Sequence, residues 1–149
     1  MVWRFIIVTG PGELHFVKGN INAEKYICLM KDALVPFMDS IPLAERFKVV
    51  FQQDNAAPHR ARTTMEFFQR EHIVVPPWPA LSPDINQIEN VWVVMKRAVR
   101  KDQSATLNQL RSSILHAWNE TVTPTFCARL YGSMQSRIQN VISHNGLRL

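Results

Sequence analysis

A chain of 149 residues is long enough to bury the core of one domain. Apolar residues make up 46% of the chain and charged residues 19%, which excludes an intrinsically disordered protein, and no apolar run is long enough to span a membrane. The net charge of +5 is concentrated in residues 90–149, which contain eight Lys and Arg but two Asp and Glu; this asymmetry favours a polyanionic partner, with a solvated basic surface as an equally weighted alternative.

The N-terminal segment is apolar but has no basic leader, so we expect a strand there and no signal peptide. Residues 2–8 are rich in aromatic and β-branched side chains, which predicts the first strand. The Gly and Pro content of residues 9–12 predicts a turn, and residues 14–18 predict a second strand. The chain should therefore begin with a β-hairpin.

A helix is predicted after the hairpin. Asn22 is a suitable N-cap, and Pro36 and Pro42 predict the end of the helix and the loop beyond it. Apolar residues spaced by three or four form one face of this helix: Tyr26, Met30, Ala33 and Phe37.

The next predicted strand, residues 48–54, runs from apolar residues into polar ones and ends at Asp54. A buried strand that ends in this way places its last side chain at the edge of a sheet. After a loop we expect a helix to about Glu71 and a short strand over residues 73–75. The segment 76–79 contains three Pro and cannot be regular structure, because Pro lacks the donor that a ladder needs.

An amphipathic helix should follow the Pro-rich segment. Ser82 and Pro83 are a strong helix start, and the helical pattern continues to about Arg100. Its predicted apolar face consists of residues spaced by three and four: Ile85, Ile88, Trp92, Met95 and Val99.

Two further helices complete the predicted order. Thr106 and Gln109 fit a capping box for the first, and Thr123 with Pro124 begins the last. The predicted face of the first is Leu107, Leu110, Ile114 and Trp118, and that of the last is Leu130, Met134, Ile138 and Val141. This order of strands and helices favours an α/β domain with a helical C-terminal tail.

Asp54 and Glu89 are the candidate metal ligands. Asp54 ends a predicted strand, and Glu89 lies at the edge of the apolar stripe of the helix that begins at Ser82. Two carboxylates brought together repel each other unless a cation lies between them, and oxygen ligands suit a hard ion such as Mg²⁺. Many α/β proteins contain one Asp at a strand end and one Glu on a helix. Taken alone, the pair therefore does not distinguish a catalytic metal site from two acids without a catalytic role.

The residues around both acids resemble motifs of the Tc/mariner transposases. Residues 52–59, Gln-Gln-Asp-Asn-Ala-Ala-Pro-His, resemble the second-aspartate motif of that family, and residues 78–92 resemble its third-acid motif. Between Asp54 and Glu89 lie 34 residues, the separation typical of the Tc branch with its Asp, Asp, Glu triad. Other segments also fit the family, so the resemblance covers essentially the whole chain: residues 1–3, 12–14, 22–26 and 141–146.

This resemblance implies an RNase H-like fold with a mixed sheet and flanking helices, and residues 1–149 would be part of a DDE endonuclease catalytic domain. It implies cut-and-paste DNA transposition, with Mg²⁺ or Mn²⁺ in a two-metal site held by Asp54 and Glu89. It also implies transposon-end DNA and a second copy of the chain as partners, no membrane association, and a nuclear location.

The motifs contain further candidate residues. The resemblance gives supporting roles to Asn55, His59 and Asn90, although a lone His five residues after an acid is more often a loop hydrogen-bonder than a ligand. Basic residues after Glu89 are candidates for phosphate contacts, with a solvated helix face as a nearly equal alternative: Lys96, Arg97, Arg100 and Lys101.

The chain also departs from the family pattern. Gln87 stands where Pro is usual, which suits a helix, and Arg4 stands where Gly is common, which could crowd the packing of the strands. In the family, the first catalytic Asp and its strand precede the segment that resembles residues 1–3, and helix-turn-helix domains precede both. We therefore expect residues 1–149 to lack the first strand and these domains and to be inactive by themselves.

Three hypotheses about function stay open at this point. The first is an enzyme that cleaves DNA as a transposase, complete or fragmentary. The second is a non-catalytic DNA- or protein-binding module derived from one, which would use the basic C-terminal part. The third is a decayed open reading frame whose product has no role.

Overall fold

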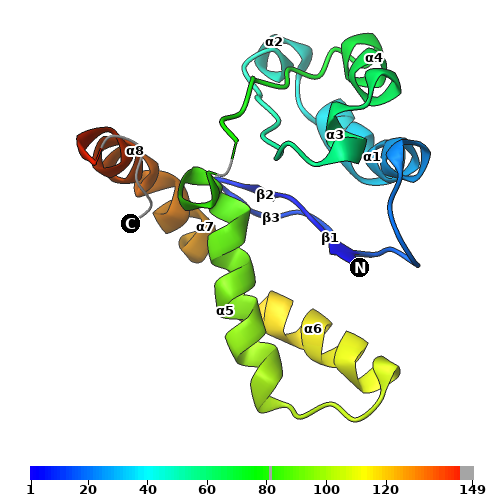
Figure 1. The fold of residues 1–149 in the computed structure, drawn as a ribbon, viewed down its shortest axis with the longest axis vertical. Coiled ribbons are helices and arrows are strands. Elements are labelled where there is room, and N and C mark those ends of the chain that lie inside the picture. The colour runs from blue at the N-terminus through cyan, green and yellow to red at the C-terminus, as the bar shows by residue number, and fades with distance from the viewer. Residues whose placement is uncertain (81, 145–149) are drawn as a thin grey trace. The chain divides into compact units, whose positions relative to one another are not determined.

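The computed structural model in Figure 1 describes residues 1–80 and 82–144. The chain forms two compact units, which are described separately. The first unit comprises Met1–Val2 and His15–Leu81, and the second comprises Trp3–Leu14 and Ser82–Leu149. In the described part of the chain, no helix is both long and apolar enough to cross a membrane.

The strands are all short and lie near the N-terminus: β1 (Val2–Trp3), β2 (Ile6–Ile7), β3 (Gly10–Pro11) and β4 (His15–Phe16). β1 pairs with β4, and β2 pairs antiparallel with β3, so the predicted hairpin is confirmed. The single long strand over residues 2–8 is wrong, because its residues form two short strands, β1 and β2, which pair with different partners, β4 and β3. Gly10, predicted in the turn, is paired within β3 at a φ of 151° that favours glycine.

The first unit contains four helices among its described residues: α1 (Ala23–Ser40), α2 (Leu43–Arg46), α3 (Ala57–Arg60) and α4 (Arg62–Arg70). Asn22 caps α1 as predicted, because its side-chain oxygen accepts a hydrogen bond of 2.9 Å from the Lys25 backbone. The predicted end at Pro36 is wrong, since α1 continues to Ser40; Pro removes one helical donor, and the rest of the turn stays bonded.

The core of the first unit lies where α1 packs against α3 and α4. Tyr26, Met30 and Ala33 are buried as the spacing predicts, and Phe67 and Phe68 of α4 are buried with them. The helix predicted up to Glu71 is interrupted at Ala61, whose extended backbone (φ −57°, ψ 140°) separates α3 from α4. The loop after Asp54 therefore ends in one isolated helical turn.

Residues 48–54 differ most from the sequence-based prediction. They form no regular strand, and residues 73–75 do not either: one parallel bridge joins Val50 to Val74, with Phe51 N donating to Val74 O at 2.8 Å. A strand needs a continuous ladder, and this bridge is isolated and belongs to no strand. Asp54 thus follows a bridged, extended segment.

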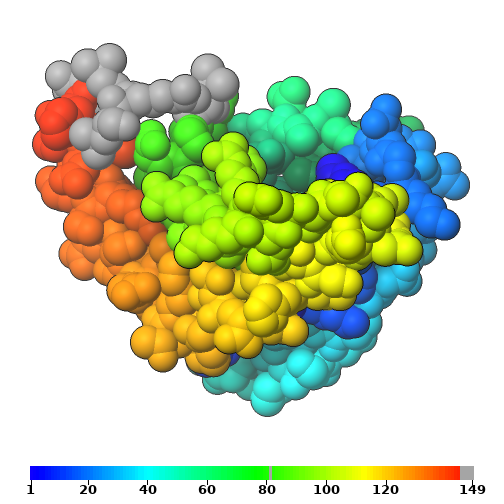
Figure 2. Space-filling view, turned by 90° about the horizontal axis from the view of Figure 1, so that it is seen from below, coloured from blue at the N-terminus to red at the C-terminus, as the bar shows by residue number. Residues whose placement is uncertain are grey.

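The second unit contains one 3₁₀ turn and four longer helices among its described residues: η1 (Pro83–Ile85), α5 (Gln87–Lys101), α6 (Leu107–Thr121), α7 (Pro124–Gly132) and α8 (Met134–Ser143). Figure 1 shows α5 and α6 side by side, and Figure 2 shows them packed together on one face of this unit. The core cluster of this unit draws residues from α5, from α6 and its C-cap, and from α7: Val91, Met95, Ala117, Trp118, Val122 and Cys127.

The helix predicted from Ser82 to Arg100 is divided. The backbone of Asn86 is extended (φ −86°, ψ 107°), so η1 ends before it and α5 begins after it. The side chain of Ser82 makes no capping hydrogen bond to η1. Glu89 consequently lies in the first turn of α5 instead of the second turn of a longer helix.

The capping box of Thr106 and Gln109 is confirmed, with both reciprocal bonds present at the start of α6. The predicted apolar face of α6 is wrong in its first half, because Leu107 and Leu110 are exposed whereas Ser113 is buried. α6 meets α5 along a different stripe from the one that the Leu spacing favours. The first predicted position, Leu107, lies beyond this packed part of the helix pair.

The last predicted helix is also divided, since α7 ends at Gly132 and α8 begins at Met134. Thr123 caps α7 by accepting a 3.2 Å hydrogen bond from Phe126 N. Ile138 of the predicted face is 43% exposed. The predicted C-terminal residues Asn145 and Gly146 lie outside the described part of the chain.

Arg4 stacks on a core aromatic ring. Its guanidinium carbon lies 3.6 Å from the centroid of the Trp118 ring, a cation–π arrangement in which Trp118 is fully buried. Burial lowers the pKa of Arg4 to about 10, while the nearby Glu13 carboxylate acts in the opposite direction. Arg4 therefore stays charged at neutral pH and joins the hairpin to α6.

Tyr131→Phe should destabilise the second unit. The Tyr131 hydroxyl donates a 2.9 Å hydrogen bond to Ile6 O, and losing such a bond costs about 1 kcal/mol. Burial, and secondarily the Cys127 thiol, raise the pKa of Tyr131 above 10.0. The protonated Tyr131 hydroxyl therefore contributes its full share of the free energy of unfolding below pH 10. This contribution is lost as the pH rises through the folded-state pKa of Tyr131.

Urea unfolding at neutral and alkaline pH tests this expectation. The wild type should lose stability above pH 10, and the Phe variant should lose less over the same range. Equal stability of the two proteins at neutral pH would contradict the role given to the hydroxyl.

Candidate functional site

A hollow of about 310 Å³ surrounds Asp54 in the first unit. It has room for several water molecules, each of which takes roughly 30 Å³ in the liquid. Its lining unites the motif around Asp54 with the Pro-rich segment: Gln53, Asp54, Asn55, His59, Arg60, Met65, Val75, Pro76, Pro77 and Trp78. Segments more than twenty residues apart in the sequence thus meet at one carboxylate.

The two oxygens of the Asp54 carboxylate have different surroundings. Oδ1 accepts hydrogen bonds from the Ala56 backbone at 3.0 Å and from His59 Nδ1 at 2.6 Å. The bond to Ala56 closes a turn of the Asx type, which is a local preference of Asp. Within the described residues Oδ2 receives no hydrogen bond, and the side chain is 55% exposed. Oδ2 is therefore the oxygen available to a ligand.

His59 is held from two sides. Its ring stacks on that of Tyr26, with centroids 4.2 Å apart and planes inclined by 31°. Gln53 bridges the same pair: it accepts from the Tyr26 hydroxyl at 2.8 Å and donates to His59 O at 3.3 Å. Tyr26 and Gln53 thus belong to the site, although the sequence motifs did not indicate a role for either. Tyr26 lies on the predicted apolar face of α1, and a buried Tyr hydroxyl needs a hydrogen-bond partner. This feature of the sequence could have indicated a polar contact at Tyr26.

Asn55 connects the motif loop to the Pro-rich segment. Its Nδ2 donates a 2.8 Å hydrogen bond to Trp78 O. Pro residues flanking Trp78 leave few backbone donors there, so this side-chain bond is a main link between the two segments.

Glu89 lies in the second unit, exposed, in the first turn of α5. The unpaired N–H groups at a helix N-terminus favour a carboxylate at this position. Asn90 lies beside it and donates from Nδ2 to Asn86 O at 3.5 Å, a long contact across the helix start. The predicted position beside Ile85 on one helix is wrong, because Ile85 belongs to η1.

Glu89 shares the solvent face of α5 with basic residues. At 100° per residue, Glu89, Lys96 and Arg100 fall within about 40° of one another, whereas Arg97 lies about 80° and Lys101 about 120° around the helix from Glu89. Along the axis, Lys96 lies about 10 Å and Arg100 about 16 Å from Glu89. The four predicted phosphate-contacting residues are exposed and make no ion pair among the described residues: Lys96, Arg97, Arg100 and Lys101.

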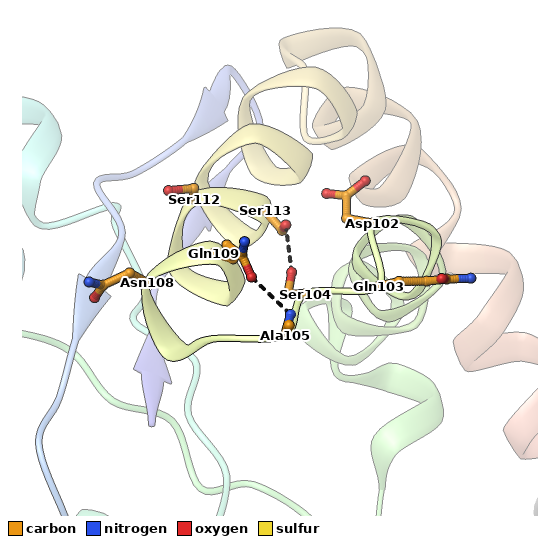
Figure 3. Close-up of a pocket in the computed structure, with 8 residues that line it drawn as sticks. All are labelled: Asp102, Gln103, Ser104, Ala105, Asn108, Gln109, Ser112 and Ser113. Atoms are coloured by element: carbon orange, nitrogen blue, oxygen red, sulfur yellow. Dashed lines mark hydrogen bonds between the residues drawn. The ribbon is translucent and has the colours of Figure 1, made fainter.

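The larger hollow, of about 490 Å³, lies where α5 leads into α6 (Figure 3). Its polar groups are mutually bonded: Ser104 Oγ lies 2.9 Å from Ser113 Oγ, and Gln109 accepts from Ala105 N at 3.0 Å. Asp102 is its one charged lining residue. These bonds cap α6 and fasten the loop, so the hollow is explained as part of a helix–helix connection.

The donor atoms of Asp54 and Glu89 suit a hard divalent ion, since both offer exposed carboxylate oxygens. They belong to different units, so their approach stays a prediction. The part of the chain that the structure describes contains no group of three His, Cys, Asp or Glu that could hold a metal ion. Each of the two carboxylates by itself therefore has the donor chemistry of a ligand for such an ion.

Comparison with known proteins agrees with the motifs. The sequence profile of the DDE superfamily endonucleases matches residues 3–111. The chain is 30% identical over 148 residues to the Tc3 transposase of Caenorhabditis elegans, an alignment that covers 98% of this chain and 44% of that protein. The chain thus spans less than half the length of this relative.

Solved structures share the fold. The Mos1 transposase catalytic domain with raltegravir and Mg superposes with a TM-score of 0.86 at 18% identity, covering 99% of this chain and 76% of that one. A Mos1 transposase paired-end complex with the left transposon end gives a TM-score of 0.83 at 18% identity, covering 97% of this chain and 43% of that one.

The helices and short strands, with this likeness, define an α/β domain of the RNase H-like fold, as predicted. The chain belongs to the DDE superfamily endonucleases, and within them to the Tc/mariner transposases.

Asn55→Ala should loosen the Pro-rich segment. Removing the bond to Trp78 O costs about 1 kcal/mol, so amides of residues 73–80 should exchange roughly fivefold faster with deuterium. Hydrogen-exchange mass spectrometry measures this change, with peptides from α1 as the internal control. Unchanged exchange over residues 73–80 would show that the bond does not hold the segment.

Proposed function

We propose that residues 1–149 form part of the catalytic domain of a cut-and-paste DNA transposase, which cleaves and rejoins DNA strands at transposon ends. The supporting observation is the Asp54 carboxylate, which has Oδ1 hydrogen-bonded and Oδ2 available in a hollow lined by family-motif residues. An acid held by its own loop and open on one side is suited to bind a metal ion.

In this proposal Asp54 and Glu89 are the ligands of Mg²⁺ or Mn²⁺. When bound, such ions activate water and stabilise the leaving oxygen in phosphodiester cleavage. Asp54 offers Oδ2, and Glu89 offers an exposed carboxylate at the start of α5. Asn55 and Asn90 support the two acids through their bonds to Trp78 O and Asn86 O.

DNA is the proposed partner, contacted through the solvent face of α5. With a scissile phosphate at Glu89, neighbouring phosphates of the same strand would lie along the helix near Lys96 and Arg100, because these residues follow Glu89 on one face. Repulsion among four unpaired cations on two turns is relieved by phosphate groups. From the family we propose that the whole protein acts in the nucleus as a homodimer.

A second candidate is a non-catalytic DNA-binding module derived from a transposase. It is favoured by one observation: the four cations of α5 are exposed and make no ion pair among the described residues. Such a module would use the same basic face of α5 and would not depend on Asp54.

Replacing Lys96, Arg97, Arg100 and Lys101 together by Gln should weaken DNA binding. The wild type should bind duplexes weakly, without sequence preference and with strong dependence on salt. For every phosphate that the variant no longer neutralises, the slope of log affinity against log salt should fall by about 0.9. Fluorescence anisotropy with an unrelated duplex over a salt series measures the slope.

The matched control replaces four exposed cations of the first unit by Gln: Lys18, Lys25, Lys31 and Arg70. Both variants lose the same formal charge, so a general charge effect would weaken them equally. An equal loss in the two variants, or binding that is insensitive to salt, would contradict the phosphate-contacting role of α5.

A polypeptide limited to residues 1–149 should not nick DNA. It supplies two carboxylates, whereas two-metal chemistry holds its ions about 3.5–4 Å apart with a bridging ligand that the resemblance assigns to a further Asp. A version extended upstream to include a strand with that Asp should nick a transposon-end substrate with Mn²⁺. Glu89→Gln in the extended version should abolish this activity. Nicking by residues 1–149 that disappears in Glu89→Gln would contradict the expectation.

A further inference from the structure

We propose that His59 is a positioning residue that holds the Asp54 carboxylate in the orientation in which Oδ2 faces the metal ion. The inference rests on the proposed function, because it takes Asp54 as a metal ligand. It assigns to His59 a specific task within that site, and it gives Tyr26 and Gln53 the task of holding His59.

The first step is the saturation of Oδ1. A carboxylate that can rotate about χ2 presents either oxygen to a ligand. Here the Ala56 amide and His59 Nδ1 both donate to Oδ1, at 3.0 Å and 2.6 Å. With two donors on Oδ1, rotation would break both bonds. Oδ2 is thereby kept for the metal ion as a single-oxygen ligand.

The second step is the fixing of His59 itself. Its side chain is only 17% exposed, and its ring lies on that of Tyr26, which is 1% exposed in the core of the first unit. Gln53 bonds both to the Tyr26 hydroxyl and to His59 O. The imidazole therefore has little freedom, and Nδ1 stays directed at Asp54. Nδ1 donates in the Nδ1–H tautomer and in the imidazolium alike, so the bond does not require a charged ring.

The third step concerns the alternative, a His that only stabilises the loop. A loop-stabilising His would affect folding and leave the metal affinity of Asp54 unchanged. Residues that orient a metal ligand affect affinity, with losses that are typically 10- to 100-fold. Metal binding therefore separates the two roles, and folding stability without metal provides the second measurement.

The experiment measures Mn²⁺ binding to the 149-residue chain by electron paramagnetic resonance, for the wild type and three substitutions. Asp54→Asn should abolish the saturable binding. His59→Leu removes the donor and should lower the affinity at least about tenfold. His59→Asn places an amide N–H where Nδ1 was, so it should keep the affinity within about threefold of the wild type, less than the loss of a ligand-orienting residue.

Controls exclude trivial causes. His116→Leu replaces an exposed His of α6 and should leave Mn²⁺ binding unchanged. Urea unfolding without metal should show that His59→Leu and His59→Asn are folded under the binding conditions. Tyr26→Phe keeps the stacked ring and loses the bond to Gln53, so it should lower the affinity less than His59→Leu.

The outcomes are distinguishable. Wild-type affinity in folded His59→Leu, with binding lost in Asp54→Asn, would overturn the positioning role and leave the metal site standing. Equal losses in His59→Asn and His59→Leu would also overturn it, because the donor would not be the relevant feature. Saturable Mn²⁺ binding that does not depend on Asp54 would overturn the proposed function itself.

Discussion

The hydrogen bond between His59 and Asp54 joins the candidate site to the core of the first unit. Asp54 is more than half exposed, and an exposed carboxylate has little orientation of its own. Its order comes from the Ala56 amide and from His59, whose ring lies on the buried ring of Tyr26 in α1. The packing of α1 against α3 and α4 therefore determines which oxygen of Asp54 is accessible. A change deep in this core would be transmitted to the site without touching the motif.

A comparable constraint acts on the second acid, at the start of α5. The extended backbone of Asn86 separates η1 from α5, so Glu89 lies in a first helical turn, where unpaired N–H groups stabilise a carboxylate. Arg137 of α8 donates to Asp84 O at 3.2 Å and to Leu130 O at 3.3 Å, which fastens η1 to the C-terminal helices. The basic residues of the segment 90–149 thus include one with a structural role, Arg137, and an exposed group on α5.

Membership of the DDE superfamily endonucleases rests on the matched profile and the relatives, whereas the local geometry indicates how the motif residues cooperate. The motif around Asp54 contains its own supports: Gln53, Asn55 and His59 each bond to a different neighbour. This explains in physical terms why so many polar residues occur in a short loop beside one acid. A single metal-ligating Asp would need far fewer of them if its orientation did not matter.

The sequence by itself determined the local features and the family. The cap at Asn22, the capping box of Thr106 and Gln109, and the motifs at Asp54 and Glu89 are patterns of neighbouring residues, so they can be recognised without a fold. The tertiary structure alone decided that residues 48–54 form one bridge instead of a strand, and that Tyr26 holds His59. Backbone ladders and side-chain partners depend on residues distant in the chain, and no local pattern specifies which of them will meet.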